Sequence, residues 1–416
     1  MTPHETKITL KELSHAIAQA RAKGEDASDL IAWHHSLRQR QANGHPPPRD
    51  VTPPPPRLEV LTSLADLQDA EYEELLQDAG TISPFMTLDW LEPWHAAFGS
   101  NHDLHLAVVR QGERLLAVLP FMIGLERYHG VRRPVTRFIG TGPGLRGNYF
   151  TIPLRPDATD QALDLIRDRI EYLHTTTTLL LENLSPFADG TPTLNLLCYH
   201  PRRSLSITAD GACIHGPLPD TFDEFIASVP AATRRTSLRH GDAVLRQHGD
   251  VEYRVCRTPG QIPEFLDWLA RFSIERRARE GQQSTWGLPE NSEVRGQICA
   301  RLLARDRLRL ELLIYNRQPI AALIGFVYNN IYFCYNTALN QAFSDFQPGH
   351  ILLAWRIREC ISEGLSGFNF LVGDAEYKRQ YFRQALPELT ATVLPPRGIQ
   401  HCFEGAYQFL RGLRRL

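Results

Sequence analysis

A proline–glycine pair in the C-terminal part of the chain could hold an anion. Pro348 and Gly349 come directly before apolar residues at helical spacing, so they would open a helix. A glycine there lets a ligand approach the backbone, and the first free amides with the positive helix end suit a pyrophosphate. The amides of Gly349, His350 and Ile351 are the expected donors. A plain turn without a ligand is the alternative, because most such pairs are turns.

A second group of residues that could do chemistry follows a short apolar run at 368–372. It contains Asp374, Glu376, Tyr377 and Lys378. Carboxylates at the end of a buried strand can act as general bases. The structural alternatives are that Asp374 caps the helix after it and that Lys378, four residues later, forms a local ion pair with it.

The elements that must position these residues are short and well delimited. Apolar runs separated by turn residues predict three strands, then a helix that ends before Gly364, then a fourth strand. In order, these elements are expected at 308–315, 320–328, 331–338, 351–361 and 368–372. The order is hairpin, strand, glycine loop, helix, strand.

This order resembles the acyl-CoA N-acyltransferase fold of the GNAT superfamily. The segments 346–353 and 367–378 resemble its CelD-like acetyltransferase branch, which is related to Fem-type transferases and shows a Pro-Gly-x-x-Leu helix start and a Gly-Asp-x-x-Tyr-Lys segment. Two departures are visible: Asn369 stands where the branch has Asp between two aromatics, and the loop keeps one glycine. The resemblance covers about 225–390, is looser over 58–200 and is absent before residue 57.

The resemblance implies a donor and its binding site. Acetyl-CoA or another acyl-CoA would be the donor substrate, with its pyrophosphate on the loop that runs from Gln347 to Ile351. Backbone donors for the thioester carbonyl would come from the strand at 332–338, near Asn336 or Thr337. No metal is implied.

Direct acyl transfer needs a base for the amine and an acid for the leaving thiolate. Tyr335 or Tyr377 could supply the proton, because the ordinary pKa of a tyrosine exceeds that of a thiol. Asp374 and Glu376 are the candidate bases. Cys334 on the central strand could instead carry the acyl group, but a buried core thiol is the simpler interpretation.

Residues 58–200 repeat the same order of elements. A hairpin at 104–110 and 114–123, a strand at 136–139, a helix at 162–173 and a strand at 178–184 are expected. No glycine lies close to that helix's first turn, so only the C-terminal half is expected to bind the cofactor. The glycine-rich stretch 140–147 is interpreted as a loop rather than a phosphate cradle, and it could line an acceptor cleft between the halves.

An arginine-rich helix is expected between the two halves, at 232–248. Its basic residues can be a solvated face, or one or two of them, such as Arg235 and Arg239, can clamp a phosphate of the acceptor or cofactor. Lys378 is a further candidate for that contact. CelD-like and Fem-type proteins have an arginine-rich helix at this point too.

Length and composition limit the number of domains and the classes of function. The 416 residues suggest about two to three domains: an extension at 1–56 with two amphipathic segments and a proline-rich spacer, an N-terminal half at 57–200 and a C-terminal half at 201–416. With 45 Lys and Arg against 47 Asp and Glu, general nucleic-acid binding is not expected. Sixteen histidines show no metal-binding spacing.

The cysteines and the hydropathy pattern favour a cytoplasmic protein. The seven cysteines lack CxxC spacing, which indicates free thiols in a reducing compartment. Neither a membrane-spanning run nor the apolar segment of a signal peptide is expected.

The sequence therefore predicts an α/β (α+β) protein with two GNAT-like halves in tandem, mixed sheets flanked by helices and a helical N-terminal extension. The expected activity is N-acyl transfer to an amine of a small-molecule, sugar or peptide acceptor. Two alternatives remain open. One is a Fem-type transferase that takes its donor from aminoacyl-tRNA, and the other is a degenerate GNAT binding module in surface-polysaccharide synthesis.

Overall fold

The computed structural model describes residues 54–395 apart from 129, 143, 200–203, 231 and 374. The chain divides into two units, Met1–Pro54 and Pro55–Leu416. The helices and spacer expected at 1–56 therefore lie, except for the last three residues, outside the described residues. Asp374 also lies outside them.

The N-terminal half contains five strands and the helices that cover them. The strands are β1 (Arg57–Leu61), β2 (His102–Gln111), β3 (Arg114–Tyr128), β4 (Val131–Phe138) and β5 (Thr178–Leu184). The helices are α3 (Asp69–Asp78), α4 (Leu88–Phe98), α5 (Asp160–Thr176) and α6 (Thr191–Cys198). A short 3₁₀ turn, Leu64–Asp66, precedes α3.

The C-terminal half also combines strands with helices. Its strands are β6 (Ser204–Pro217), β7 (Val251–Val255), β8 (Leu308–Tyr315), β9 (Gln318–Tyr328), β10 (Ile331–Leu339), β11 (Gly367–Val372) and β12 (Gln384–Leu394). Its helices are α7 (Phe222–Ser228), α8 (Ala232–His248), α9 (Ile262–Arg279), α10 (Pro289–Ala304), α11 (Pro348–Ser362) and α12 (Glu376–Arg379).

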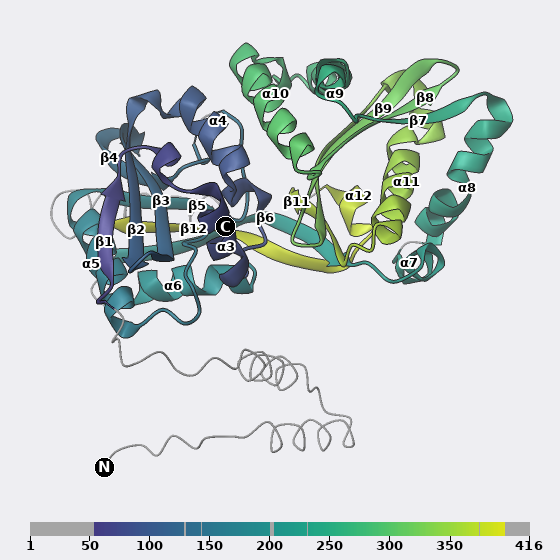
Figure 1. The fold of residues 1–416 in the computed structure, drawn as a ribbon. Helices are drawn as coiled ribbons and strands as arrows, with labels where there is room; N and C mark the ends of the chain where they lie inside the picture. Colours follow the sequence, from purple (N-terminus) through teal and green to yellow (C-terminus); the bar gives the residue numbers. More distant parts are fainter. Residues whose placement is uncertain are drawn as a thin grey trace, which may run out of the picture. The chain divides into compact units, whose positions relative to one another are not determined.

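The strands of both halves form one twelve-stranded mixed sheet in the described part of the chain. Its order is β1-β2-β3-β4-β5-β12-β6-β11-β10-β9-β8-β7. The last strand, β12, lies between β5 and β6 and is antiparallel to both, so the end of the C-terminal half completes the N-terminal half (Figure 1). This confirms the α/β class and the mixed sheet flanked by helices.

Helices cover both faces of the sheet in the C-terminal half (Figure 1). Along β9, Ala322, Ile324 and Phe326 belong to the core that includes residues of α9, whereas Ala321 and Leu323 belong to the core under α11. Successive strand residues point to opposite faces, so α9 and α11 lie on opposite sides of the sheet. Burial on both faces explains why these strands are continuous apolar runs rather than alternating ones.

Candidate functional site

The two central strands of the C-terminal half separate after a short parallel contact. β10 pairs with β11 only from Ile331 to Phe333. Its antiparallel pairing with β9 continues to Leu339, with a register shift that leaves Tyr335 as a bulge. In the described part of the chain, the edge of β10 beyond Phe333 therefore has no partner strand on the β11 side, and its backbone groups can bind a ligand.

Side chains hold the end of β11 in its divergent path. The Asn369 side-chain oxygen accepts hydrogen bonds from the Leu371 amide (2.7 Å) and the Tyr149 hydroxyl (2.9 Å). Leu371 takes a left-handed backbone conformation with φ of 56°. Lys378 Nζ donates to the carbonyls of Phe370 (2.9 Å) and Val372 (3.2 Å), so this lysine fixes the strand end. Asn369 thus helps to fix the end of β11 where it diverges from β10.

A pocket of about 370 Å³ lies in this split. It is lined by residues of α9, β10, β11 and the segment around α12: Arg276, Arg277, Glu280, Cys334, Tyr335, Asn336, Thr337, Phe370, Val372, Ala375, Tyr377 and Lys378. The structure therefore brings together most of the residues that were expected around the reacting thioester. Glu376 is exposed and is not among the lining residues.

Both candidate acids hold their protons at neutral pH. Burial raises the pKa of Tyr335 to about 12, and burial also raises the pKa of Tyr377. The Tyr335 hydroxyl donates to the Arg146 carbonyl (3.4 Å) in the glycine-rich stretch, and its ring packs against Trp90 of the N-terminal half. Each phenol can therefore donate a proton to a thiolate.

The other lining groups of β10 are positioned by neighbours. Asn336 Nδ2 donates to the Ser273 hydroxyl (3.2 Å) on α9. The Cys334 sulfur lies 3.5 Å from the Thr337 hydroxyl. Burial raises the pKa of the Cys334 thiol to about 11, so it is protonated at neutral pH and a poor nucleophile.

The start of α11 leaves one amide free. Gln347 has a left-handed backbone (φ 53°) and its side chain does not cap the helix, and Pro348 has no N–H. The amides of His350 (2.9 Å) and Ile351 (3.2 Å) both donate to the Gln347 carbonyl. Of the three expected donors, only the Gly349 amide has no acceptor among the described residues. An anion at this helix end would meet that amide.

Arg234 of α8 lies beside this helix start. Its guanidinium donates to the side-chain oxygens of Gln347 (2.9 Å) and Gln380 (2.7 and 3.0 Å). Burial lowers the pKa of Arg234, and none of the described carboxylates pairs with it. The His350 Nδ1 lies 2.6 Å from the Tyr381 hydroxyl, and burial together with Arg234 lowers the pKa of His350 to about 4. His350 is therefore neutral at pH 7.

A second pocket, of about 270 Å³, lies between α8 and α11 at this point. Its lining residues come from the two helices and the loop before α11: Thr236, Ser237, His240, Gly241, Val244, Leu245, Asp345, Phe346, Gln347, His350 and Ile351.

The arginines singled out from the sequence lie elsewhere on α8. Arg239 pairs with Asp223 at 3.5 Å, and both side chains are largely exposed. Arg235 makes no ion pair within the described part of the chain. The helical period could have identified Arg234 instead, because the buried Leu238 lies one turn after it on the same face.

The corresponding split in the N-terminal half is filled. β4 pairs with β5 only at Val135 and Thr136. Beyond that point, the segment 149–155 is bonded on both sides. The Phe150 amide donates to the Asn183 carbonyl (2.8 Å) of β5, and the Arg155 amide donates to the Leu116 carbonyl (2.9 Å) of β3.

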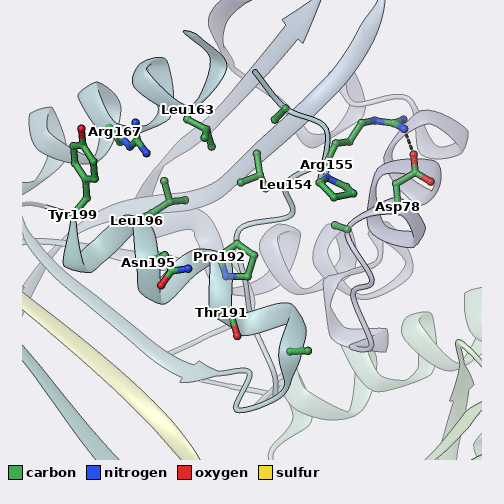
Figure 2. Close-up of a pocket in the computed structure, with 14 residues that line it drawn as sticks. Asp78, Leu154, Arg155, Leu163, Arg167, Thr191, Pro192, Asn195, Leu196 and Tyr199 are labelled. Carbon is green, nitrogen blue, oxygen red and sulfur yellow. Dashed lines mark hydrogen bonds and ion pairs between the residues drawn. The ribbon is translucent and has the colours of Figure 1, made fainter. Parts of the chain in front are cut away.

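The N-terminal half also has a pocket, of about 530 Å³, between α5, α6 and the segment before α5. Figure 2 shows its largely apolar wall, with Leu154, Leu163 and Leu196. Arg155 turns toward Asp78 and bonds to it. Arg167 lies over the Tyr199 ring at 3.9 Å. Arg155 is thus engaged with Asp78, and Arg167 with the Tyr199 ring and Asp164.

Two kinds of feature are absent from the described residues. None of their helices combines the length and apolarity that a membrane span requires. They also contain no cluster of three or more His, Cys, Asp or Glu side chains that could hold a metal ion.

Residues 232–379 match the family model described as an acetyltransferase (GNAT) domain. Among solved structures, FemX has a TM-score of 0.53 at 10% identity, covering 81% of this chain and 97% of that chain. The tandem GNAT protein from the clavulanic acid biosynthesis pathway has a TM-score of 0.44 at 12% identity, covering 82% and 99%.

A conserved protein of unknown function from Bacteroides thetaiotaomicron has a TM-score of 0.48 at 13% identity, covering 81% of this chain and 100% of that chain. The likeness to FemX is one of fold. Comparison with curated proteins finds no match.

Proposed function

Starting from the GNAT-type acetyltransferase domain at residues 232–379, we propose that this protein transfers an acetyl or longer acyl group from acyl-CoA to an amine. The observation that carries the proposal is the open edge of β10 beyond Phe333, beside a pocket lined by two protonated tyrosines. An extended thioester arm can pair with such an edge through main-chain hydrogen bonds.

The donor's phosphates would bind at the start of α11. The free Gly349 amide and the helix dipole favour a negative group there, and Arg234 supplies a cation that has no carboxylate partner among the described residues. A phosphate could replace the Gln347 side-chain oxygen as the acceptor for Arg234, because a charged acceptor makes the stronger hydrogen bond. The pocket between α8 and α11 offers adjoining space for the rest of the donor.

The reaction is proposed to be direct. The acceptor amine attacks the thioester carbonyl, backbone N–H groups of β10 near Asn336 and Thr337 stabilise the oxyanion, and Tyr335 or Tyr377 protonates the leaving thiolate. Asp374 is the proposed base. Its sequence neighbour Ala375 lines the pocket, whereas the other candidate, Glu376, does not. An acyl-enzyme on Cys334 is not favoured, because burial keeps that thiol protonated.

The acceptor is proposed to enter between the two halves. The glycine-rich stretch of the N-terminal half contacts the pocket residue Tyr335 through the Arg146 carbonyl, so this stretch would line the acceptor's path. Its conformation needs glycine, because Gly140, Gly142 and Gly144 have φ between 92° and 102°.

Calorimetric titration with acetyl-CoA, together with an assay for thiol release in the presence of amines, tests the proposal. We expect one acetyl-CoA per chain and amine-dependent release of the CoA thiol. Binding of aminoacyl-tRNA in place of acetyl-CoA would favour a Fem-type activity instead. Binding of neither donor would contradict both and leave a module without catalysis.

A further inference from the structure

One cation in the pocket of the β10–β11 split has no partner. Arg276 lies in the last turn of α9 and lines that pocket. Its side chain makes no hydrogen bond or ion pair with any described residue, and its Nε is buried without an acceptor. A buried N–H without an acceptor is costly, so such a group is usually satisfied by something that binds.

The other charged side chains that the structure describes in this pocket already have hydrogen-bond partners. Arg277 donates to Glu280 (3.3 Å) and to Gln282. Lys378 is held by the backbone carbonyls at the end of β11. Arg276 is thus the cation available to a ligand in this pocket, and it is close enough to lower the pKa of Tyr377 by its charge.

Arginines at a helix C-terminus also have an ordinary role, because they offset the helix dipole. That role suffices for Arg279, in the same last turn, which is exposed and does not line the pocket. It does not explain why Arg276 is directed into the split with its Nε buried.

The position of Arg276 separates it from the phosphates of the donor. α9 and α11 lie on opposite faces of the sheet, as the two cores along β9 establish. The proposed phosphate site at the start of α11 is therefore on the other face. A ligand that reaches Arg276 comes through the split from the α9 side, where the amine must approach the thioester.

From this geometry, and resting on the proposed acyl transfer, we infer that the acceptor is an anionic amine whose carboxylate or phosphate pairs with Arg276. The guanidinium would hold the anion while the amine reaches the β10 bulge. Arg276 is then a specificity-determining residue. It takes no part in the proton transfers.

Binding of paired amines tests the inference. We would titrate the CoA-saturated protein, at fixed ionic strength, with amino acids against their amides and with hexosamine 6-phosphates against the free hexosamines. At least one anionic member should bind roughly 10- to 100-fold tighter than its neutral partner, as expected for a charge-assisted hydrogen bond. Preference for amino acids would identify a carboxylate, and preference for sugar phosphates a phosphate.

Two variants make the test specific. Arg276→Gln should abolish the preference, Arg276→Lys should restore part of it, and the matched control Arg279→Gln, which removes the same charge from the same helix turn, should retain it. Equal binding of both members in every pair, or an undiminished preference in Arg276→Gln, would overturn the inference. An anionic amine that binds through Arg276 without thiol release would leave the anion site standing and remove the acyl-transfer proposal.

Discussion

The two halves differ in what occupies the gap between their two central strands. In each, two parallel central strands touch briefly and then separate, β4 from β5 and β10 from β11. The N-terminal half closes its split with its own segment 149–155, hydrogen-bonded to the strands on both sides. The C-terminal half leaves its split open as a pocket of about 370 Å³. The same topology thus makes a packed core in one half and an open pocket in the other.

The helices beside the two splits also differ in whether a side chain caps their N-terminus. The N-terminus of α5 is capped by its own Thr159, whose hydroxyl accepts from the Ala162 amide (3.3 Å). The N-terminus of α11 has no side-chain cap at Gln347 and has Arg234 next to it. A helix N-terminus whose amides are already capped has fewer free N–H groups to bind an anion than an uncapped one. Both differences favour the C-terminal half as the proposed donor site.

The largest expected effect concerns the proposed base, Asp374. Asp374→Asn should lower turnover by roughly 100- to 10,000-fold, because it removes the proposed proton acceptor while keeping a similar shape. Acetyl-CoA affinity should stay the same. The control is Glu376→Gln, at the exposed residue two positions on. Initial rates of thiol release measure both variants, and a full rate in Asp374→Asn would assign the base elsewhere.

A substitution in the segment that fills the N-terminal split should lower stability without creating a second donor site. Phe150 is fully buried and stacks on Phe138. Phe150→Ala should reduce the free energy of unfolding by about 3–5 kcal/mol, because it leaves a cavity in the core. Urea denaturation measures this loss. Calorimetry should still find one acetyl-CoA per chain, and a second binding event would mean that the segment 149–155 alone had prevented binding in this half.

The role of Arg234, which lies beside α11, can be tested by comparison with Arg239 on the same helix, α8. Arg234→Gln should weaken acetyl-CoA binding roughly 10- to 100-fold, because a charge-assisted contact to phosphate is lost. Arg239→Gln, which breaks only an exposed pair with Asp223, should change the affinity little. Acetyl-pantetheine lacks the pyrophosphate, so neither variant should alter its binding. An equal loss for both donors in Arg234→Gln would show that the effect is structural.

The smallest expected effect is on the pH dependence of stability. The folded pKa of His350, about 4, lies below its ordinary value of 6.5, so the folded state binds this proton less readily than the unfolded state. Stability is therefore lost as pH falls from about 6.5 toward 4. His350→Gln should reduce the loss between pH 7 and 5 by about 1–2 kcal/mol, measured by urea denaturation.

A matched histidine lies in the N-terminal half, where burial lowers the pKa of His105 to about 4. His105→Gln should flatten the pH dependence similarly but leave acetyl-CoA affinity unchanged. His350→Gln should lower that affinity, because His350 lines the pocket beside α11. The same affinity in both variants would contradict the assignment of the donor to the C-terminal half.

Local patterns predicted the elements around the site closely. β8, β5 and α8 begin and end where the sequence indicated, because apolar runs or helical spacing are interrupted there by turn residues. The pairing of β12 between β5 and β6 was not predicted. It joins segments far apart in the chain, and local propensity carries no information about such pairing.

The site itself was predicted in part, for a physical reason. Tyr335, Thr337 and Tyr377 meet in one pocket because they lie on the strand and turn that the motifs identified. The choice between Arg234 and Arg235 depends on which face of α8 packs on α11, and the arginine count does not reveal that face. Similarly, the sequence cannot show that the His350 amide is already bonded to the Gln347 carbonyl.

Hydrogen–deuterium exchange with and without saturating acetyl-CoA tests the central claim most directly, because it reports both splits in one experiment. We predict slower exchange in peptides that cover residues 334–339 of β10 and 347–351 at the start of α11. Peptides that cover 149–155 and β5 should exchange at the same rate in both states. Protection of 149–155 and β5, with no change in β10 and α11, would contradict the assignment of the donor site to the C-terminal half.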